Sequence, residues 1–455
     1  MGAARLLAGQ RRYFASGATR SAAWRRDQLH ALLRLLGERE EEVTGALEQD
    51  LGKSGTEAFL SEIAVVRAEA DHALRHLDRW MAPERIAVPL GLRPARAWTQ
   101  ARPLGTVLII GPWNYPLQLV LAPLVGALAA GNTAVLKPSE LAGSTSRLLA
   151  RLVPLYLDPQ AVAVVEGGVE ASTDLLAQPF DHVFYTGGER VGKIVMKAAA
   201  EHLTPVTLEL GGKSPAVVVG GDVRAAARRI AYGKFMNAGQ TCVAPDYVLT
   251  TPDAAPVLAD ALADAVRHFY GSDPRASHDY GRIINEQHFD RLVGLLTDGT
   301  VASGGRYERA ERYLEPTVLR DVDPGSALMQ EEIFGPLLPI VEVEDLDEAI
   351  GFIGARPHPL AAYLFSDHEE HLREFAGRVQ AGGLAHNVCT IQLAVPGLPF
   401  GGVGASGTGS YHGRRSFETF SHQQPVFSKP TRLDTLRLAY PPFGPLKRKL
   451  LRRLL

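Results

Sequence analysis

Two hydrophobic patterns divide the chain. Up to about residue 80, apolar side chains recur at the spacing of an amphipathic helix. One such face comprises Trp24, Leu29, Leu32, Leu33 and Leu36. From Gly105 onward, short β-branched runs alternate with helical segments, a pattern that predicts crossover units and a parallel sheet.

The predicted strands fall into two groups. The first contains 106–110, 133–136, 161–165 and 182–185. The second lies in an α/β region from Val217 to about Leu384 and contains 216–219, 247–250 and 337–343, with a helix predicted at 224–235. Ligands of parallel sheets bind beyond the carboxyl ends of the strands. Polar or glycine-rich loops follow three strands of the first group, so we expect a cofactor crevice there.

The segment from Pro83 to Pro103 departs from both patterns. It contains four prolines, few acids and short extended pieces, which is typical of an arm or linker. A turn-dense stretch from Leu398 to Gly407 is expected to be a flexible or closely approached loop.

Composition narrows the classes of function. A chain of 455 residues should form two or more domains. Its 48 basic and 50 acidic side chains nearly cancel, which argues against nucleic acid as a partner. Two cysteines, Cys242 and Cys389, are too few for a disulfide framework or a structural zinc site, so we expect a reducing compartment and no metal. The longest apolar run, 119–130, is too short to span a bilayer.

The N-terminal segment is basic. Six arginines and no acid precede Asp27, which is somewhat like a transit peptide. We favour a first helix whose basic face lies in water.

Glu209 and Cys242 are the first candidates for chemistry. A thiolate attacks carbonyl carbons, and a carboxylate activates water against the resulting thioester. The two residues are 33 positions apart, so only the fold can bring them together. A free thiol has a pKa of about 8.5, and we therefore expect the site to help ionise Cys242. Without further motifs, a surface glutamate and a buried cysteine would be the simpler interpretation.

A glycine-rich loop at 185–193 follows a predicted strand and opens a probable helix. Glycines at such a place let a dinucleotide approach backbone amides at the positive end of the helix. The G-x-G-x-x-G fingerprint is absent, so the loop alone is a weak signal.

Taken together, these segments resemble the aldehyde dehydrogenases, and most closely the class 3 branch of that superfamily. The matching motifs are Gly111-Pro112-Trp113-Asn114-Tyr115-Pro116, Lys137-Pro138-Ser139-Glu140, 208–215, 239–242, Glu331-Glu332-Ile333-Phe334-Gly335-Pro336, 398–404 and, for class 3 in particular, 409–413 and 416–420. The likeness covers roughly Tyr13 to Phe427.

The resemblance implies a mechanism. Cys242 would attack the aldehyde as a thiolate, forming a thiohemiacetal and then a thioester. The carboxamide of Asn114 and the backbone N–H of Cys242 would hold the developing oxyanion. Glu209 would act as the general base for hydrolysis. The substrates implied are aromatic or medium-to-long-chain aliphatic aldehydes, which are oxidised to carboxylic acids.

The resemblance also implies NAD or NADP as cofactor, with NAD favoured because a carboxylate at Glu140 would repel a 2′-phosphate. The residues expected to bind the cofactor are Trp113, Lys137, Glu140, Gly187, Gly192, Glu332 and Phe334. Gly188 stands where the family usually has serine, so one hydroxyl contact is missing. Cys389 is expected to be a packing residue.

The implied fold is α/β: a Rossmann-like cofactor-binding domain, an α/β catalytic domain and a small oligomerisation arm. The expected boundaries are 1–82 and 103–209 for the NAD(P)-binding domain, 210–411 for the catalytic domain and 83–102 with 412–430 for the arm. A cytoplasmic homodimer is expected.

Residues 431–455 form a basic amphipathic tail. Five leucines fall on one helical face, Leu446, Leu450, Leu451, Leu454 and Leu455, and five basic residues occupy the remainder. Such a helix predicts weak peripheral membrane association. Packing of the leucines on the protein itself or on a second subunit is the alternative.

The sequence leaves three other functions as alternatives. A cysteine hydrolase would pair Cys242 with a histidine, although no recognisable Cys/His motif is present. A CoA-acylating dehydrogenase would replace hydrolysis by thiolysis, and the presence of Glu209 favours water. A non-catalytic structural protein would have no reason to combine Cys242, Glu209 and Asn114.

Overall fold

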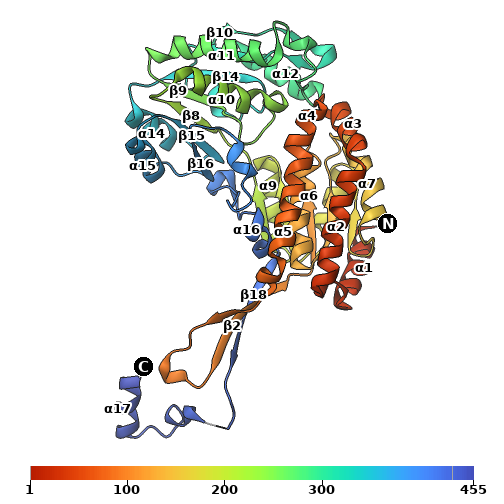
Figure 1. The fold of residues 1–455 in the computed structure, drawn as a ribbon, viewed down its shortest axis with the longest axis vertical. Helices are drawn as coiled ribbons and strands as arrows, with labels where there is room; N and C mark the ends of the chain where they lie inside the picture. The colour runs from red at the N-terminus through yellow and green to blue at the C-terminus, as the bar shows by residue number, and fades with distance from the viewer. Residues whose placement is uncertain (1, 433, 455) are drawn as a thin grey trace.

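The computed structural model describes residues 2–432 and 434–454, which form two α/β bodies and a projecting arm (Figure 1). The first body contains a six-stranded sheet in the order β17-β7-β6-β3-β4-β5. Its strands are β3 (Thr106–Ile110), β4 (Thr133–Lys137), β5 (Val162–Val164), β6 (His182–Thr186), β7 (Val206–Glu209) and β17 (Gly407–Thr408). All neighbours are parallel except β17, which is antiparallel to β7. The four predicted strands of the first group are thus confirmed.

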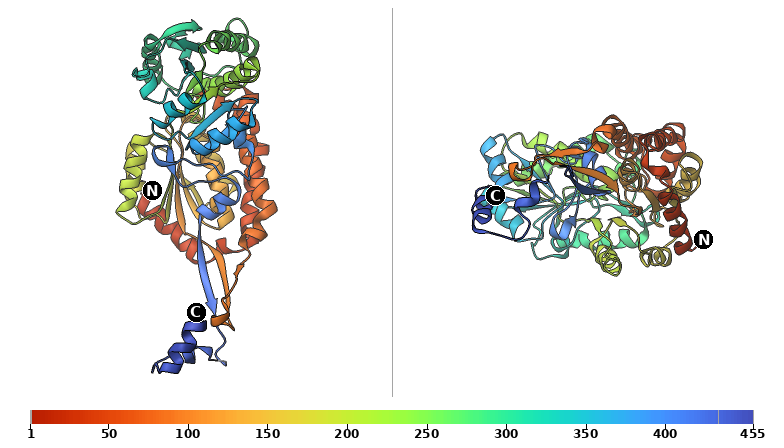
Figure 2. Two further views of the ribbon diagram at one scale, coloured as in Figure 1. Left: turned by 90° about the vertical axis from the view of Figure 1, so that its left-hand side faces the viewer. Right: turned by 90° about the horizontal axis from the view of Figure 1, so that it is seen from below.

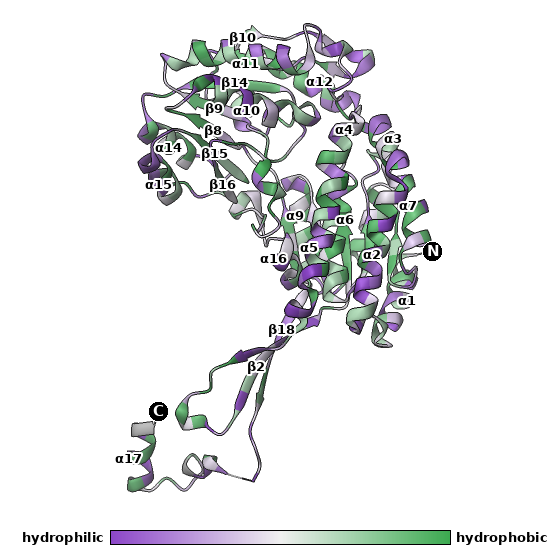
Figure 3. Ribbon diagram, in the orientation of Figure 1, coloured by the Kyte–Doolittle hydropathy of each residue, from purple (hydrophilic) through white to green (hydrophobic). Residues whose placement is uncertain are grey.

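Helices surround this sheet and supply most of its core. They are α1 (Ala3–Ala15), α2 (Ala22–Glu38), α3 (Glu40–Leu51), α4 (Gly55–Ala58), α5 (Ala64–Met81), α6 (Gln118–Ala130), α7 (Gly143–Tyr156), α8 (Val169–Leu176) and α9 (Glu189–Ala200). Helix α6 is apolar on all sides, and Figure 3 shows it as hydrophobic along its length. A helix of this kind is expected to be buried, and every residue after Gln118 is.

The basic N-terminal segment is helical, as expected, but its arginines do not all lie in water. Arg5, Arg11 and Arg12 are exposed on α1. Arg25 is instead buried, because its guanidinium donates to the backbone carbonyls of Thr19, Arg20 and Ala129. These hydrogen bonds compensate for removing the charge from water.

The second body contains a seven-stranded sheet in the order β10-β13-β14-β9-β8-β15-β16. Its strands are β8 (Pro215–Val218), β9 (Tyr247–Thr250), β10 (Thr300–Ser303), β13 (Thr317–Arg320), β14 (Leu337–Glu342), β15 (Ala361–Phe365) and β16 (Gly383–His386), beside a small hairpin of β11 (Tyr307–Glu308) and β12 (Tyr313–Leu314). Its helices are α10 (Val223–Phe235), α11 (Ala254–Tyr270), α12 (Glu286–Gly294), α13 (Ala327–Gln330), α14 (Leu346–Gly354) and α15 (Glu369–Arg378). The three strands and the helix predicted for this region are confirmed.

The arm is a three-stranded antiparallel sheet that extends away from both bodies (Figures 1 and 2). It consists of β1 (Glu84–Ile86), β2 (Arg96–Pro103) and β18 (Ser421–Ser428), and β2 and β18 pair over eight residues. The first expected arm segment therefore lies in the arm. The second does so only from residue 421 onward.

Residues 413–420 belong to the first body instead of the arm. Helix α16 (Gly413–Thr419) packs on α6, and Phe417 and Phe420 are buried in the core of this body. Gly126 permits the close approach, since a Cβ at this position would lie 2.6 Å from the Cβ of Ser416. The apolar side chains of α16 therefore anchor the base of the arm.

The C-terminal tail forms α17 (Pro445–Leu454) beyond the arm (Figure 1). Leu446 is 74% exposed and Leu450 is 42% exposed, so neither leucine is buried against the rest of the chain. Leu455, the last residue of the predicted apolar face, lies outside the described residues. Across residues 2–432 and 434–454, no helix has the length and apolarity needed to cross a membrane.

Candidate active site

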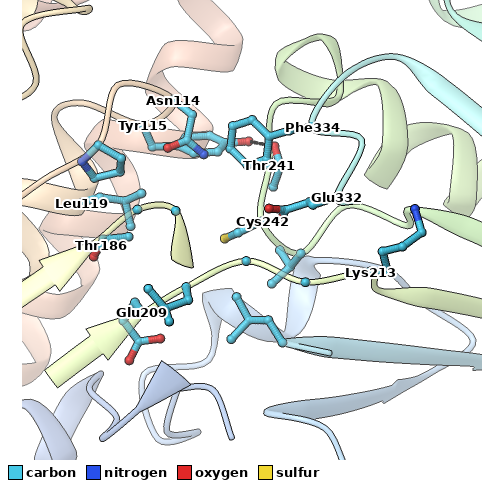
Figure 4. A pocket seen from close by; sticks show the side chains of 18 of the residues that line it. Asn114, Tyr115, Leu119, Thr186, Glu209, Lys213, Thr241, Cys242, Glu332 and Phe334 are labelled. Carbon is cyan, nitrogen blue, oxygen red and sulfur yellow. Dashed lines mark hydrogen bonds between the residues drawn. The ribbon is translucent and has the colours of Figure 1, made fainter. Parts of the chain in front are cut away.

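A cavity of about 1340 Å³ lies where loops of the two bodies meet. Seven predicted site residues line it: Trp113, Asn114, Gly187, Glu209, Cys242, Glu332 and Phe334. Figure 4 labels five of them, Asn114, Glu209, Cys242, Glu332 and Phe334. The seven residues come from the loop after β3, the ends of β6 and β7, and two loops of the second body. Lys137, Glu140 and Gly192 lie outside this lining. The fold thus brings together residues more than 200 positions apart.

A turn of left-handed backbone presents Cys242. Asn237, Ala238 and Gly239 have φ angles of 53°, 50° and 76°. Non-glycine residues adopt this region at a cost of about 1–2 kcal/mol each, so the surroundings must hold the turn. The side chain of Asn237 does so by donating to the carbonyls of Asn114 and Gln240. The turn therefore ties the cysteine to the loop after β3.

Asn114 lies in that loop and is buried. Its Nδ2 donates to the carbonyl of Gln240 at 2.9 Å, and its amide group has a second N–H to offer. The hydroxyl groups of Tyr115 and Thr241 are 2.6 Å apart, which makes a second bridge between the loop and the residue before Cys242. These contacts fix a carboxamide near the thiol.

The thiol of Cys242 is not ionised by its surroundings. Burial, and to a smaller extent the nearby carboxyl groups of Glu332 and Glu209, raise its pKa to about 12. Backbone N–H groups of Cys242 and Val243 oppose this rise. The residues of the chain therefore do not by themselves lower the pKa of the thiol, because desolvation outweighs the two N–H groups.

Glu209 lies at the end of β7 and is almost fully buried. Neither of its carboxyl oxygens has a hydrogen-bond partner among the described residues. Burial raises its pKa well above the ordinary value, because the charged carboxylate is removed from water. In Figure 4 its carboxyl group points away from the Cys242 sulfur. Action as a base requires the group to ionise and to turn toward the thiol.

Tyr411 lines the same cavity and was missed by sequence reasoning. Burial raises the pKa of its phenol, and charges on Glu209 and Cys242 contribute to the rise. It belongs to the class 3 segment 409–413, so the motif was visible although no role was assigned to the residue. A phenol at this position adds a hydrogen-bonding group to the cavity.

Glu332 also faces the cavity. Its Oε1 has no hydrogen-bond partner in the described part of the chain, and burial, with the charge of Asp246 nearby, raises its pKa to about 8. Asp246 also accepts from the backbone N–H of Ile333 at 3.1 Å and from Lys213 at 2.5 Å. Asp246, a buried carboxylate that sequence reasoning missed, therefore fixes the loop that carries Glu332.

The residues present fit a dinucleotide. Helix α9 follows Gly187 and Gly188 and begins without a side-chain cap from the described residues, so its first amides are free for an anion. Thr186 Oγ1 is buried at the preceding strand end and lacks a partner within the described ranges. Gly192 allows α9 to approach Leu210, since a Cβ there would lie 2.7 Å from a methyl group.

Aromatic rings and a lysine complete the predicted cofactor set. The Trp113 and Phe334 rings meet edge to face at 5.2 Å. Lys137 ends β4, is buried, and lies 3.5 Å from the Glu140 carboxylate. Burial lowers the pKa of Lys137, and Glu140 opposes the change. Cys389 is buried in the core of the second body, as its expected packing role requires.

Two crossover sheets, a glycine-rich helix start and a cysteine in the cavity between them are together typical of a class of dinucleotide-dependent oxidoreductases. The profile described as "Aldehyde dehydrogenase family" matches residues 4–426. The chain belongs to the aldehyde dehydrogenase family. Members of this family are NAD(P)-dependent oxidoreductases, and this protein is an enzyme that oxidises aldehydes to carboxylic acids.

Individual relatives agree with this assignment. The rat protein "Aldehyde dehydrogenase, dimeric NADP-preferring" is 49% identical over 434 residues, covering 95% of this chain and 96% of the relative. Mouse "Aldehyde dehydrogenase family 3 member A2" is also 49% identical, with 95% and 90% covered. The substrate-bound structure of Staphylococcus aureus AldH superimposes with a TM-score of 0.96 at 44% identity, covering 99% of this chain and 98% of that one. The predicted family, fold class and class 3 likeness are confirmed.

Proposed function

We propose that Cys242, Asn114 and Glu209 carry the reaction, with Cys242 as the nucleophile. The observation that supports this most directly is their convergence on one cavity from three separate elements. The thiolate adds to the aldehyde carbon, and the second N–H of Asn114 together with the Cys242 backbone N–H stabilises the oxyanion. After oxidation the acyl group is a thioester on Cys242. Glu209 then takes a proton from the water that attacks it.

The cofactor NAD(P) supplies the hydride acceptor when bound. Glu332 would hold its nicotinamide ribose, Phe334 and Trp113 would border the ring, and Gly187 with the start of α9 would hold the phosphates. Lys137 and Glu140 would contact the adenosine ribose. The unpaired Glu332 and Thr186 oxygens support this placement.

We propose that the enzyme favours NAD. The Glu140 carboxylate would repel a 2′-phosphate, whereas the Lys137 ammonium would offset part of that repulsion. Because Lys137 is already 3.5 Å from Glu140, its charge is partly neutralised. The test is the ratio of kcat/KM for the two cofactors in the wild type and in Glu140→Gln. NADP should gain on NAD in the variant, and a wild type that prefers NADP would refute the proposal.

The mechanism is tested by Glu209→Gln and Cys242→Ser in a rapid-mixing experiment. Glu209→Gln should produce about one equivalent of reduced cofactor and then turn over slowly, because oxidation precedes the hydrolytic step. Cys242→Ser should produce no burst while still binding NAD. Loss of the burst in Glu209→Gln would give this residue an earlier role, and full turnover by Cys242→Ser would exclude the covalent mechanism.

The division into an NAD(P)-binding domain of 1–82 and 103–209 and a catalytic domain of 210–411 is likewise proposed. The two sheets support it, although β17 pairs with the first sheet. Met1 lies outside the described residues.

Medium-to-long aliphatic or aromatic aldehydes are the proposed substrates, since apolar side chains such as Leu119, Met236 and Leu393 line the cavity.

We propose that the arm joins two copies into a homodimer. Its surface is apolar for an extended segment, with Leu90 80% exposed and Ile86 and Phe427 about half exposed. The relative from rat named as dimeric supports the same state. Sedimentation of the wild type against Leu90→Asp/Phe427→Asp tests it. A wild type that sediments as a monomer would refute the proposal.

A cytoplasmic location, with weak peripheral attachment to membranes through α17, completes the proposal. Two free cysteines support a reducing compartment. Exposed leucines beside basic residues on α17 support attachment to an anionic surface.

A further inference from the structure

An ion pair lies completely buried beneath the loop that carries Asn114. Lys53 follows α3, and Glu62 lies in a π-helical turn at Phe59–Ile63 between α4 and α5. Both side chains are 0% exposed, and Lys53 Nζ is 2.5 Å from Glu62 Oε1. No motif in the sequence marks either residue.

The pair holds the Asn114 loop at two places, at Asn114 itself and where the loop enters α6. Lys53 Nζ donates to the Asn114 carbonyl at 3.0 Å and lies 4.0 Å from the centre of the Tyr115 ring. The second oxygen of Glu62 accepts from the backbone N–H groups of Leu117 and Gln118 at 2.9 and 3.0 Å. The loop is thus fixed at Asn114 and again three to four residues after it.

The same contacts reach the cysteine turn. The Asn114 carbonyl that accepts from Lys53 also accepts from Asn237 Nδ2 at 2.8 Å. Asn237 is the first left-handed residue of the turn that presents Cys242. One carbonyl oxygen therefore joins the ion pair, the Asn114 loop and the Cys242 turn.

The π-helical turn at Phe59–Ile63 contributes both to the buried ion pair and to the wall of the cavity. Wider turns of this kind are rare and often occur at functional sites. Here Glu62 points inward to Lys53, while its neighbours Leu60 and Ser61 line the cavity. One helical segment thus supplies both the buried pair and part of the wall.

Stability alone does not account for a fully buried pair. Removing two charges from water offsets much of their attraction, and well-packed apolar residues of similar volume often stabilise a protein equally or better. We infer that Lys53 and Glu62 are positioning residues, which fix the Asn114 carboxamide relative to the Cys242 sulfur. This inference rests on the role proposed for Asn114 and extends it to the residues that hold it.

The experiment compares Glu62→Gln and the charge-neutral Lys53→Met/Glu62→Gln with a matched control. Asp50→Asn is the control, because Asp50 is also a buried carboxylate that accepts from two backbone N–H groups, those of Ser144 and Thr145, but it caps α7 away from the cavity. Both variants of the pair should lower kcat/KM for the aldehyde about 10- to 100-fold, since misplacement by an ångström has effects of that size. Their dissociation constants for NAD should stay near wild type. Asp50→Asn should lower only the thermal midpoint.

A double-mutant cycle with Asn114→Ala separates positioning from general damage. If the pair acts through Asn114, Lys53→Met/Glu62→Gln should have little further effect on kcat/KM in the Asn114→Ala background. An undiminished effect there, or a double variant that no longer binds NAD, would make the pair structural and overturn the inference. An impaired Asn114→Ala beside an unimpaired double variant would overturn it as well. If Asn114→Ala itself retains wild-type kcat/KM, the proposed role of Asn114 fails, and the inference fails with it.

Discussion

Gly239→Ala should shift the turn that presents Cys242 relative to the loop that carries Glu332, which it contacts at Gly335. Gly239 has a φ of 76°, and a Cβ at this position would lie 2.2 Å from the carbonyl oxygen of Gly335. Either the Cys242 turn or the loop bearing Glu332 must therefore move by about 0.8 Å to restore a separation of 3.0 Å. These loops carry Cys242 and Glu332, for which roles in the reaction and in cofactor binding are proposed.

The magnitude follows from that displacement. Movement of a reacting group by about 1 Å can lower the rate about 10²-fold, so kcat/KM should fall roughly 10- to 100-fold. The left-handed backbone of alanine adds about 1–2 kcal/mol of strain. In a chain of this length each kcal/mol lowers the thermal midpoint by only about 1 °C, so the enzyme should stay folded at assay temperature.

Gly271→Ala is the matched control. Gly271 has a φ of 79°, but among the described residues no atom lies within 4 Å of a Cβ built there. Its ψ of −171° also places it in a region that favours glycine, so alanine should lower the thermal stability there too, but with kcat/KM unchanged. Steady-state kinetics with a saturating cofactor and thermal unfolding of both variants provide the comparison. A Gly239→Ala enzyme with wild-type kcat/KM would refute the argument from close contact.

Three further outcomes are expected. Gly188→Ser should fold normally and tighten cofactor binding a few-fold, because the space within 4 Å of its Cβ is free of other described atoms and serine adds a hydroxyl donor; weaker binding, by calorimetry, would contradict this. Glu332→Gln should speed alkylation of Cys242 by iodoacetamide above pH 8, where the Glu332 carboxylate is ionised and raises the thiol pKa; an unchanged rate would show that burial alone sets that pKa. Removing residues 445–455 should abolish low-salt sedimentation with anionic liposomes, and equal, negligible sedimentation of both proteins would exclude the membrane role.

Much of the fold follows from the sequence because its signals are local. A β-branched run such as 106–110 and a glycine turn such as 187–188 carry their meaning within a few residues, and the strands lie where these runs predicted them. The seven predicted site residues that line the cavity were likewise named from motifs. The family resemblance supplied the roles, whereas the structure supplied the convergence.

Other features depend on tertiary placement and were not predictable. Lys53 and Glu62 look like ordinary polar residues on helices until the fold encloses them. The direction of the Cys242 pKa shift depends on how much water the fold removes and on where two carboxyl groups lie. Residues 413–420 were assigned to the arm because only contacts show that Phe417 belongs to the core.

The interleaving of the chain has a consequence for its synthesis on the ribosome. The first body begins at the N-terminus, yet its sheet is completed by β17, and Asn132 donates to the carbonyl of Phe420, 288 positions later. The second body takes all its strands from residues 215–386. The first body can therefore complete its sheet only after the last part of the chain has emerged from the ribosome. The second body can complete its sheet earlier. A nascent chain of this protein therefore leaves the β7 edge of its first body unpaired until translation is almost finished, and exposed strand edges of this kind are prone to aggregation.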